Sequence, residues 1–289
     1  MKPRQLTILG VGLLGGSIGL AVRSAAPNCR IVGWGHRAST LDDAMKLGAI
    51  DVYELDLAAA VRESDLVILC APVGLFENIL KQIAGCLHAG CTVTDVGSTK
   101  RSVVALAERI LPSTVDFVGS HPMAGSEKRG VEFARADLFR QALCILTPTA
   151  GTRPAALERV EGFWRQLGMR TTRVSPQDHD RLLADISHLP HLLAAVLMSM
   201  QEDAALDLCG PGFLDSTRIA GGDGGLWRDI FLDNAQNLRG GVARLKAEID
   251  RIAGLLEPEK GEQLRQWLDA AAARRAELIK RRSSGSSGE

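Results

Sequence analysis

Three glycines close to the amino terminus constrain the fold of this chain more than any other feature of its sequence. Gly10, Gly12 and Gly15 have the spacing GxGxxG, directly after a short apolar run and at the start of a helical pattern. In such a turn the first glycine permits a tight bend, the second lets backbone approach a pyrophosphate, and the third lets helix and strand pack closely. The motif therefore predicts a βα turn that binds a dinucleotide, with the pyrophosphate at the helix N-terminus that Leu13 and Leu14 begin.

The apolar runs that follow indicate the kind of sheet to which this turn belongs. Helical patterns alternate with short apolar runs at residues 29–35, 65–73, 91–98, 116–120 and 142–149. The runs lack the polar alternation of a half-exposed strand, as is typical of parallel strands covered by helices on both faces. Repeated βα units predict an N-terminal α/β domain of the Rossmann type, with a doubly wound, mostly parallel sheet.

The second half of the chain has a different pattern. A long helical stretch at residues 176–208 is apolar nearly all round in its middle, as expected of a buried helix. Pro190 within it lacks a backbone N–H and clashes with the carbonyl of Ile186, which predicts a kink. Further helical patterns cover residues 226–255 and 259–281. We therefore predict an all-helical C-terminal domain whose excess apolar surface is covered in a homodimer.

This change of pattern also sets the expected domain boundaries. We predict a dinucleotide-binding domain over residues 1–174 and a helical substrate and dimerisation domain over residues 175–282. The low-complexity residues 283–289 are expected to be a disordered tail.

Composition argues against several classes of protein. The chain is 46% apolar and has a formal net charge of zero at pH 7, unlike disordered chains or nucleic-acid binders that depend on bulk charge. Its longest apolar run, residues 189–200, is shorter than the roughly 20 residues that a membrane-spanning helix needs. No signal-peptide pattern precedes the first strand. The six cysteines form no CxxC pair, which fits reduced core residues, so we expect a cytoplasmic protein with no nucleic-acid or membrane partner.

The end of the second apolar run bears on the choice of cofactor. Where NAD is bound, an Asp or Glu about 20 residues beyond the glycines usually binds the ribose 2′-hydroxyl. That position holds Gly35, and the residues after it would suit a 2′-phosphate better: His36, Arg37, Ser39 and Thr40. We therefore favour NADP over NAD, although Arg37 alone is equally well explained as a solvated loop charge. Ser39 or Thr40 is also the expected N-cap of the helix at residues 39–49.

Three later segments end predicted strands at one edge of the sheet. Cys70, Ala71 and Pro72 follow one strand, Ser98 follows another, and His121 ends a third. Ligands of open α/β sheets bind at the carboxyl ends of the strands, so we expect these residues to line the nicotinamide crevice. Ser98 by itself is more typical of a helix N-cap. A neutral imidazole at His121 is either a hydrogen-bonded structural residue or a base that takes the proton of a hydroxyl being oxidised.

Two groups in the helical half are candidates for the same site. His188 and His191 lie three residues apart beside Pro190, and either contribute to the site or pack at the kink. We predict no metal site, because this pair lacks a third ligand. Arg218 and Trp227 flank a glycine-rich break, where an arginine can pair with a carboxylate and a tryptophan can wall a pocket. In isolation, Arg218 and Trp227 are each more often structural.

Taken together, these motifs resemble those of the prephenate and arogenate dehydrogenases of tyrosine biosynthesis. The matching segments are the glycine motif and residues 95–100, 120–130, 186–191, 215–222 and 226–229. The resemblance implies an oxidoreductase in which a nicotinamide cofactor accepts a hydride from ring C4 of the substrate while C1 loses carbon dioxide. Prephenate would give 4-hydroxyphenylpyruvate, and arogenate would give tyrosine.

The resemblance also implies roles for individual residues. His121 matches the histidine that takes the proton of the substrate's 4-hydroxyl, and Ser98 matches the serine that helps to hold that histidine and the cofactor. Arg218 matches the arginine that pairs with a substrate carboxylate. The other matching pocket positions are His191, His188, Ser126 and Trp227, of which Ser126 and Trp227 are expected near the side-chain end of the substrate.

Two alternative functions compete with this one. A reductase related to the β-hydroxyacid dehydrogenases would use a lysine on its helical domain, but no lysine occurs between Lys128 and Lys246. A non-catalytic NAD(P)-binding sensor would be expected to lack one of the catalytic positions, whereas Ser98, His121 and Arg218 are all present.

Overall fold

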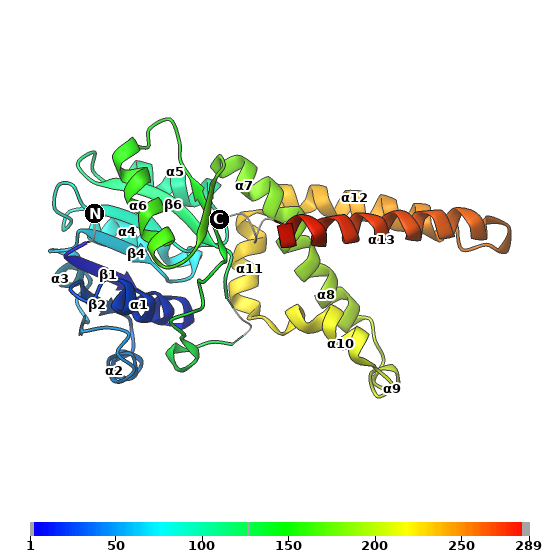
Figure 1. Cartoon of the computed structure of the whole chain (residues 1–289), viewed down its shortest axis with the longest axis horizontal. Helices are drawn as coiled ribbons and strands as arrows, with labels where there is room; N and C mark the ends of the chain where they lie inside the picture. Colours follow the sequence, from blue (N-terminus) through cyan, green and yellow to red (C-terminus); the bar gives the residue numbers. More distant parts are fainter. Residues whose placement is uncertain (1–2, 126–127, 285–289) are drawn as a thin grey trace. The chain divides into compact units, whose positions relative to one another are not determined.

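The computed structural model describes residues 3–125 and 128–284, and its first part is built on one sheet (Figure 1). Eight strands in the described residues form the order β3-β2-β1-β4-β5-β6-β7-β8. Their bounds are β1 Gln5–Leu9, β2 Arg30–Trp34, β3 Val52–Glu54, β4 Leu66–Leu69, β5 Thr92–Asp95, β6 Asp116–Pro122, β7 Leu143–Thr147 and β8 Arg170–Arg173. Strands β1 to β6 are parallel, β7 is antiparallel to β6, and β8 is parallel to β7. The predicted mostly parallel Rossmann-type sheet is therefore confirmed.

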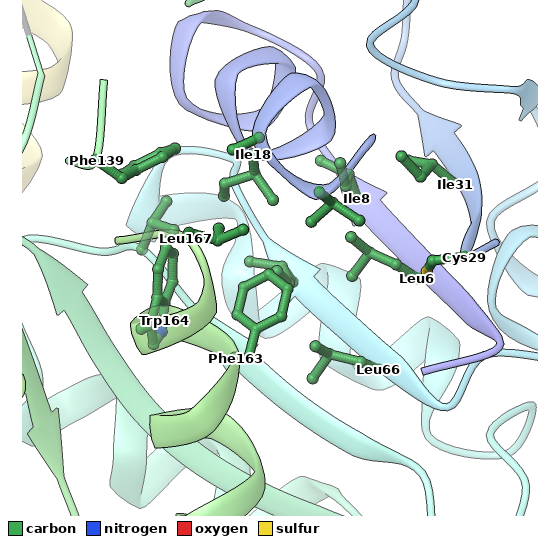
Figure 2. Close-up of a cluster of buried hydrophobic side chains, with 14 of the residues drawn as sticks. Leu6, Ile8, Ile18, Cys29, Ile31, Leu66, Phe139, Phe163, Trp164 and Leu167 are labelled. Atoms are coloured by element: carbon green, nitrogen blue, oxygen red, sulfur yellow. The ribbon is translucent and has the colours of Figure 1, made fainter. Parts of the chain in front are cut away.

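Helices cover both faces of the sheet, which explains the continuous apolarity of its strands. They are α1 Leu13–Ala25, α2 Ala38–Lys46, α3 Leu57–Val61, α4 Phe76–Ile83, α5 Arg101–Ile110 and α6 Pro154–Gln166. Leu6 and Ile8 of β1 belong to a core with α1 and α6, where Phe163 and Trp164 pack (Figure 2). Leu9 of the same strand belongs to a second core with α3, α4 and α5. A strand buried on both faces has no side free for polar alternation.

Two strands and one helix cap differ from the sequence-based expectation. The sequence patterns did not predict β3, which has three residues, or β8, whose segment RTTR is polar and mostly exposed. Helix α2 begins at Ala38, and Arg37 takes the extended N-cap conformation with no side-chain cap bond. The predicted N-cap at Ser39 or Thr40 is therefore wrong, because both residues already lie in the first helical turn.

The helical segments that follow β8 begin with an irregular helix. Helix α7, Pro176–Leu183, continues through a π-helical segment, η3, Ala184–His188, into α8, Leu189–Ser199. The π-helical segment lies directly before Pro190, at the place of the predicted kink. Since Pro190 cannot donate to the carbonyl of Ile186, a wider turn there accommodates the missing hydrogen bond. The chain then forms α9 Asp203–Leu206, α10 Pro211–Thr217, the 3-10 turn η4 Arg218–Gly221 and α11 Gly224–Asp233.

The chain divides into two compact units, residues 1–238 and residues 239–289. The last strand ends one residue before the predicted boundary at 174, but α7 to α11 are grouped with the sheet in the first unit. Helix α12, Ala235–Ala253, begins in the first unit and continues into the second, where a hydrogen bond from Trp267 Nε1 to Glu248 Oε1 at 3.1 Å links it to α13, Gly261–Ser284. Helix α13 runs to Ser284, so residues 283 and 284 of the predicted tail are helical, and the rest of that tail lies outside the described residues.

One helical run is long and apolar enough, by length and composition, to cross a membrane. This run, Pro176–Ser199, has a mean hydropathy of 1.4 over its most apolar window, and only 28% of that window is buried. It is longer than the apolar run considered in the sequence, because the helix continues through η3. Asp180 within it is buried and accepts hydrogen bonds from backbone N–H groups at the start of α5. These contacts pack the start of the run against α5 within the protein, since a buried carboxylate is costly in a bilayer.

Two helical glycines, in α1 and α6, provide a test of how closely helices pack in the sheet domain. A Cβ at Gly19 in α1 would lie 1.9 Å from the carbonyl oxygen of Ala49, whereas a Cβ at Gly162 in α6 would meet no heavy atom within 4 Å. We expect Gly19→Ala to lower the free energy of unfolding by about 1–3 kcal/mol, because backbone must move. Gly162→Ala should raise it by up to about 1 kcal/mol, because alanine favours the helix. Denaturant unfolding measures both, and equal effects of the two substitutions would contradict the close approach.

Candidate active site

The glycine motif has the geometry that a bound dinucleotide requires. Gly10 has φ +108°, and a Cβ there would lie 2.8 Å from the carbonyl of Cys70. Nothing lies within 4 Å of a Cβ built on Gly12, so space is open beside this backbone. A Cβ on Gly15 would lie 2.2 Å from the carbonyl oxygen of Gly10, so only glycine permits the close packing of α1 on the turn. Gly10 and Gly15 are thus required by close backbone approaches, and the space beside Gly12 is what the approach of a pyrophosphate would need.

The start of α1 offers backbone donors for an anion. Gly12 is the N-cap of α1 and makes no side-chain cap bond, and Leu13 and Leu14 form the first half-buried helical positions. The first N–H groups of a helix have no partner within the helix, and the helix dipole favours negative charge there. Cys70 lies against this turn and is followed by Pro72, which caps the 3-10 turn η1, Val73–Leu75. The residues present thus fit a pyrophosphate at this end of the sheet.

The end of β2 places exposed polar groups beside the glycine motif. The N–H of Gly10 donates to the carbonyl of Trp34 at 2.9 Å, and Gly35 follows directly. His36, Arg37 and Ser39 are exposed, Thr40 is half-buried, and the His36 ring packs edge-on against Trp34. No carboxylate occurs from residue 35 to residue 41.

His121 belongs to a buried chain of hydrogen bonds that starts at a carboxylate. It is the penultimate residue of β6, and its Nδ1 lies 2.9 Å from Nε2 of His179. Nδ1 of His179 lies 2.8 Å from Oδ1 of Asp180. The Asp180 carboxylate also accepts the backbone N–H groups of Lys100 at 2.8 Å and Arg101 at 2.9 Å, at the start of α5. All three side chains of the chain Asp180–His179–His121 are buried.

These bonds determine where the protons of the two imidazoles lie. Burial opposes ionisation of Asp180, but the hydrogen bonds from His179 and from two backbone N–H groups lower the pKa of its carboxyl. A carboxylate only accepts, so Nδ1 of His179 donates and its Nε2 accepts. Nδ1 of His121 must then donate, and Nε2 of His121 keeps its free electron pair. Burial first, and then electrostatic interactions with His179, Lys100 and His188, lower the pKa of His121 well below that of an ordinary histidine, so the ring is neutral at physiological pH.

A second buried network shapes the loop that leads into α5. Nζ of Lys100 is ion-paired with Asp95 and donates to the carbonyl of Thr99 at 2.9 Å, and both charged side chains are fully buried. Asp95 also accepts the N–H groups of Gly97 at 2.8 Å and of Ser120 at 3.0 Å. The ion pair thus joins the loop after β5 to the residue that precedes His121. Removing either charge would leave the other buried without a countercharge, which is costly.

The helical segments bring four further polar or aromatic groups together. The ring of His191 stacks on Trp227 with centroids 3.5 Å apart, and His188 lies edge-on to the same tryptophan. His188 and His191 are buried, and Nδ1 of His188 lies 3.2 Å from Nδ2 of Asn234. Among the described residues, Nε2 of His188 and Nδ1 of His191 are buried without a hydrogen-bond partner. A Cβ on Gly222 would lie 2.6 Å from Nε1 of Trp227, so the glycine-rich break packs against the stack.

The other predicted site residues are Arg218, Ser98 and Ser126. Arg218 is exposed at the start of η4, four residues before Gly222. Ser98 is half-buried in the loop after β5, and the hydrogen bond that orients His121 is made to His179. Ser126 lies outside the described residues. Close to it in the sequence, Arg129 is ion-paired with Asp223, the N-cap of α11.

Sequence reasoning missed three residues that orient the histidines: His179, Asp180 and Asn234. The first two lie in the polar segment PQDHDR at the start of the long helical stretch, where both look like ordinary solvated residues. Nothing in the sequence, however, relates His179 to His121, which lies 58 residues earlier. Asn234, between α11 and α12, has no motif around it.

Comparison with known proteins connects this geometry to a family. A family model described as the nucleotide-binding domain of prephenate dehydrogenase matches residues 18–173, and one described as its dimerization domain matches residues 175–270. A prephenate dehydrogenase of Bacillus subtilis is 36% identical over 283 residues, which are 94% of this chain and 76% of that protein.

Two further proteins are similar along nearly their whole length. A cyclohexadienyl dehydrogenase of Zymomonas mobilis is 31% identical over 90% of this chain and 91% of its own length. The structure of prephenate dehydrogenase from A. aeolicus, in complex with hydroxyphenyl propionate and NAD+, is 34% identical. It has a TM-score of 0.89 and covers 95% of this chain and 98% of that chain. This chain therefore belongs to the prephenate dehydrogenase family.

Proposed function

We propose that this chain catalyses the oxidative decarboxylation of prephenate to 4-hydroxyphenylpyruvate in tyrosine biosynthesis, with His121 as the general base. The observation that carries the proposal is the buried chain Asp180–His179–His121, which leaves a free electron pair on Nε2 of His121. That imidazole ends β6, at the same edge of the parallel sheet as the glycine motif. The names of the B. subtilis and A. aeolicus relatives support prephenate as the substrate.

The residues of this chain would act on the substrate's 4-hydroxyl group. A bound nicotinamide supplies the acceptor for the hydride that leaves C4 with its electron pair. Nε2 of His121 takes the hydroxyl proton as the C4–H bond breaks, and Asp180, through His179, stabilises the resulting charge. The electron pair of the bond between C1 and its carboxylate then completes the aromatic ring as carbon dioxide leaves. His121 returns the proton to the ring oxygen, so protons and electrons balance.

The remaining site residues would bind the substrate. We assign Arg218 to a substrate carboxylate, because its guanidinium can form a bidentate pair there. The buried pair of His188 and His191, with Trp227, would contact the substrate, while Ser98 would lie beside the base and cofactor, as in the motif that it matches. Arogenate is the second candidate substrate, since the Z. mobilis relative is named for the wider cyclohexadienyl class.

We also propose a homodimer, NADP as the preferred cofactor and a cytoplasmic location. The dimer is supported by the match of residues 175–270 to a dimerization domain. NADP is supported by the exposed residues His36, Arg37 and Ser39 after Gly35, while the NAD+ bound to the A. aeolicus relative makes NAD the alternative. The cytoplasmic location is supported by the six free cysteines, three of them buried.

Initial rates in a two-by-two grid test substrate and cofactor together. The grid combines prephenate or arogenate with NAD or NADP, and absorbance of the reduced nicotinamide gives the rate. We expect the highest kcat/KM for prephenate with NADP. Activity with NAD alone would contradict the cofactor proposal, and no activity with either substrate would contradict the proposed reaction.

Replacing the base should slow the reaction without affecting cofactor binding. We expect His121→Asn to lower kcat by on the order of a hundredfold or more, because general-base catalysis is lost.

The wild-type kcat/KM should fall at acid pH only below about 6.5, the ordinary histidine pKa, because the neutral form of His121 persists to lower pH.

The matched control for this substitution is His88→Asn, which changes a histidine in the turn before β5, outside the site. It should leave kcat close to the wild-type value. A wild-type acid limb at or above about pH 6.5, or near-normal turnover in His121→Asn, would remove His121 from the role of base.

Introducing an acid at Gly35 tests the cofactor proposal. A Cβ there would meet only Leu41, at 3.5 Å, so a side chain fits. We expect Gly35→Asp to raise the KM for NADP by about tenfold or more, because a carboxylate near the 2′-phosphate is repelled. The KM for NAD should fall or stay the same. The control Gly85→Asp adds the same charge at a glycine with open space around it and should change neither KM. Equal effects of the two substitutions would contradict the proposal that NADP binds beside Gly35.

A further inference from the structure

His188 is a fully buried histidine of which only one nitrogen is paired. It ends the π-helical segment η3, and its Nδ1 lies 3.2 Å from Nδ2 of Asn234. Its Nε2 is buried and has no hydrogen-bond partner in the described part of the chain. Buried polar groups are almost always paired, so an unpaired ring nitrogen in this site points to a ligand.

The amide of Asn234 has only one orientation that satisfies its neighbours. Nδ2 lies 2.7 Å from the backbone carbonyl oxygen of Asp180, which can only accept a hydrogen bond. At the other end, Oδ1 accepts from Nδ2 of Asn237 at 2.8 Å. A flipped amide would place two acceptors against each other at Asp180. Asn234 therefore presents a donor to His188.

This orientation determines the tautomer of His188. Because Nδ2 of Asn234 donates, Nδ1 of His188 accepts, and the ring proton must be on Nε2. Burial is the main cause that lowers the pKa of His188 to about 4, so the ring is neutral at physiological pH. The charged or titratable neighbours that act on it are Asp180 and Asp233, which raise its pKa, and His179 and His191, which lower it.

We infer that Asn234 is a positioning residue that holds His188 as a neutral donor through Nε2, directed to an acceptor oxygen of the substrate. The inference rests on the proposed function for the identity of the substrate, whose carboxylate and carbonyl oxygens are such acceptors. It gives the two imidazoles opposite roles: Nε2 of His121 accepts a proton, and Nε2 of His188 donates a hydrogen bond.

Asp180 connects these two roles. Its side chain accepts from His179, which orients His121, and its backbone carbonyl accepts from Asn234, which orients His188. One residue of α7 thus sets the hydrogen-bonding character of both histidines. A substrate that lacks the acceptor oxygen would leave a buried donor unpaired and would bind less tightly.

Nitrogen NMR of the wild-type enzyme without substrate tests the tautomer directly. The ring signals of His188, assigned by their loss in His188→Gln, should show an unprotonated Nδ1 and a protonated Nε2 at neutral pH. A protonated Nδ1 would overturn the inference. This measurement needs no turnover, so it separates the inference from the proposed function.

The substitution Asn234→Asp tests the consequence for binding. A carboxylate would accept at Nδ1 of His188 and draw a proton to that nitrogen, so the NMR pattern should change. We expect the KM for prephenate to rise about tenfold or more, while the KM for the cofactor stays within about twofold. Asn78→Asp, on the exposed face of α4, adds the same charge outside the network and should have no effect.

The double variant distinguishes positioning from a general structural role. In a His188→Gln background, Asn234→Asp should change the KM for prephenate by less than about twofold, because the group that it acts through is gone. An equal effect with and without His188 would overturn the inference. If Asn234→Asp fails to fold, the wild-type NMR pattern still decides.

Discussion

The structure of the site depends on one carboxylate placed at the start of a helix. Asp180 of α7 accepts the N–H groups of Lys100 and Arg101, where the dipole of α5 favours negative charge. Those bonds hold the carboxyl ionised despite its burial, and only an ionised carboxylate can order the protons of His179 and His121. The same contact joins α7 to the start of α5. The orientation of His121, the proposed base, and the packing of α7 on α5 therefore both depend on the Asp180 carboxylate.

Burial has opposite consequences for the two kinds of charged group around this site. It lowers the pKa of the histidines, which keeps His121, His179 and His188 neutral and able to accept or donate selectively. Burial of Lys100 or of Asp95 alone would be costly, but each charge is paired with the other. The fully buried ion pair joins the loop after β5 to the residue of β6 that precedes His121.

Much of the fold could be predicted because its signals are local. The glycine motif and the apolar runs predicted the sheet, since Gly10 and Gly15 are required by close backbone approaches and β1 is buried on both faces. Strand β8 was missed because an edge strand can be polar, and the N-cap of α2 was misplaced because Arg37 takes the cap conformation without a cap bond. Pro190 predicted a disturbed helix but not the π-helical turn that resolves it.

The sequence by itself determined the dinucleotide-binding fold, the family resemblance and the choice of His121, because these depend on residue types at short, regular spacings. Only the tertiary structure decided which groups orient that histidine through hydrogen bonds. His179 and Asp180 reach it from 58 or more residues along the chain, and Asn234 reaches His188 from 46 residues away. A hydrogen bond fixes a proton only when donor and acceptor meet within about 3 Å, and no spacing along the sequence encodes that distance between remote segments.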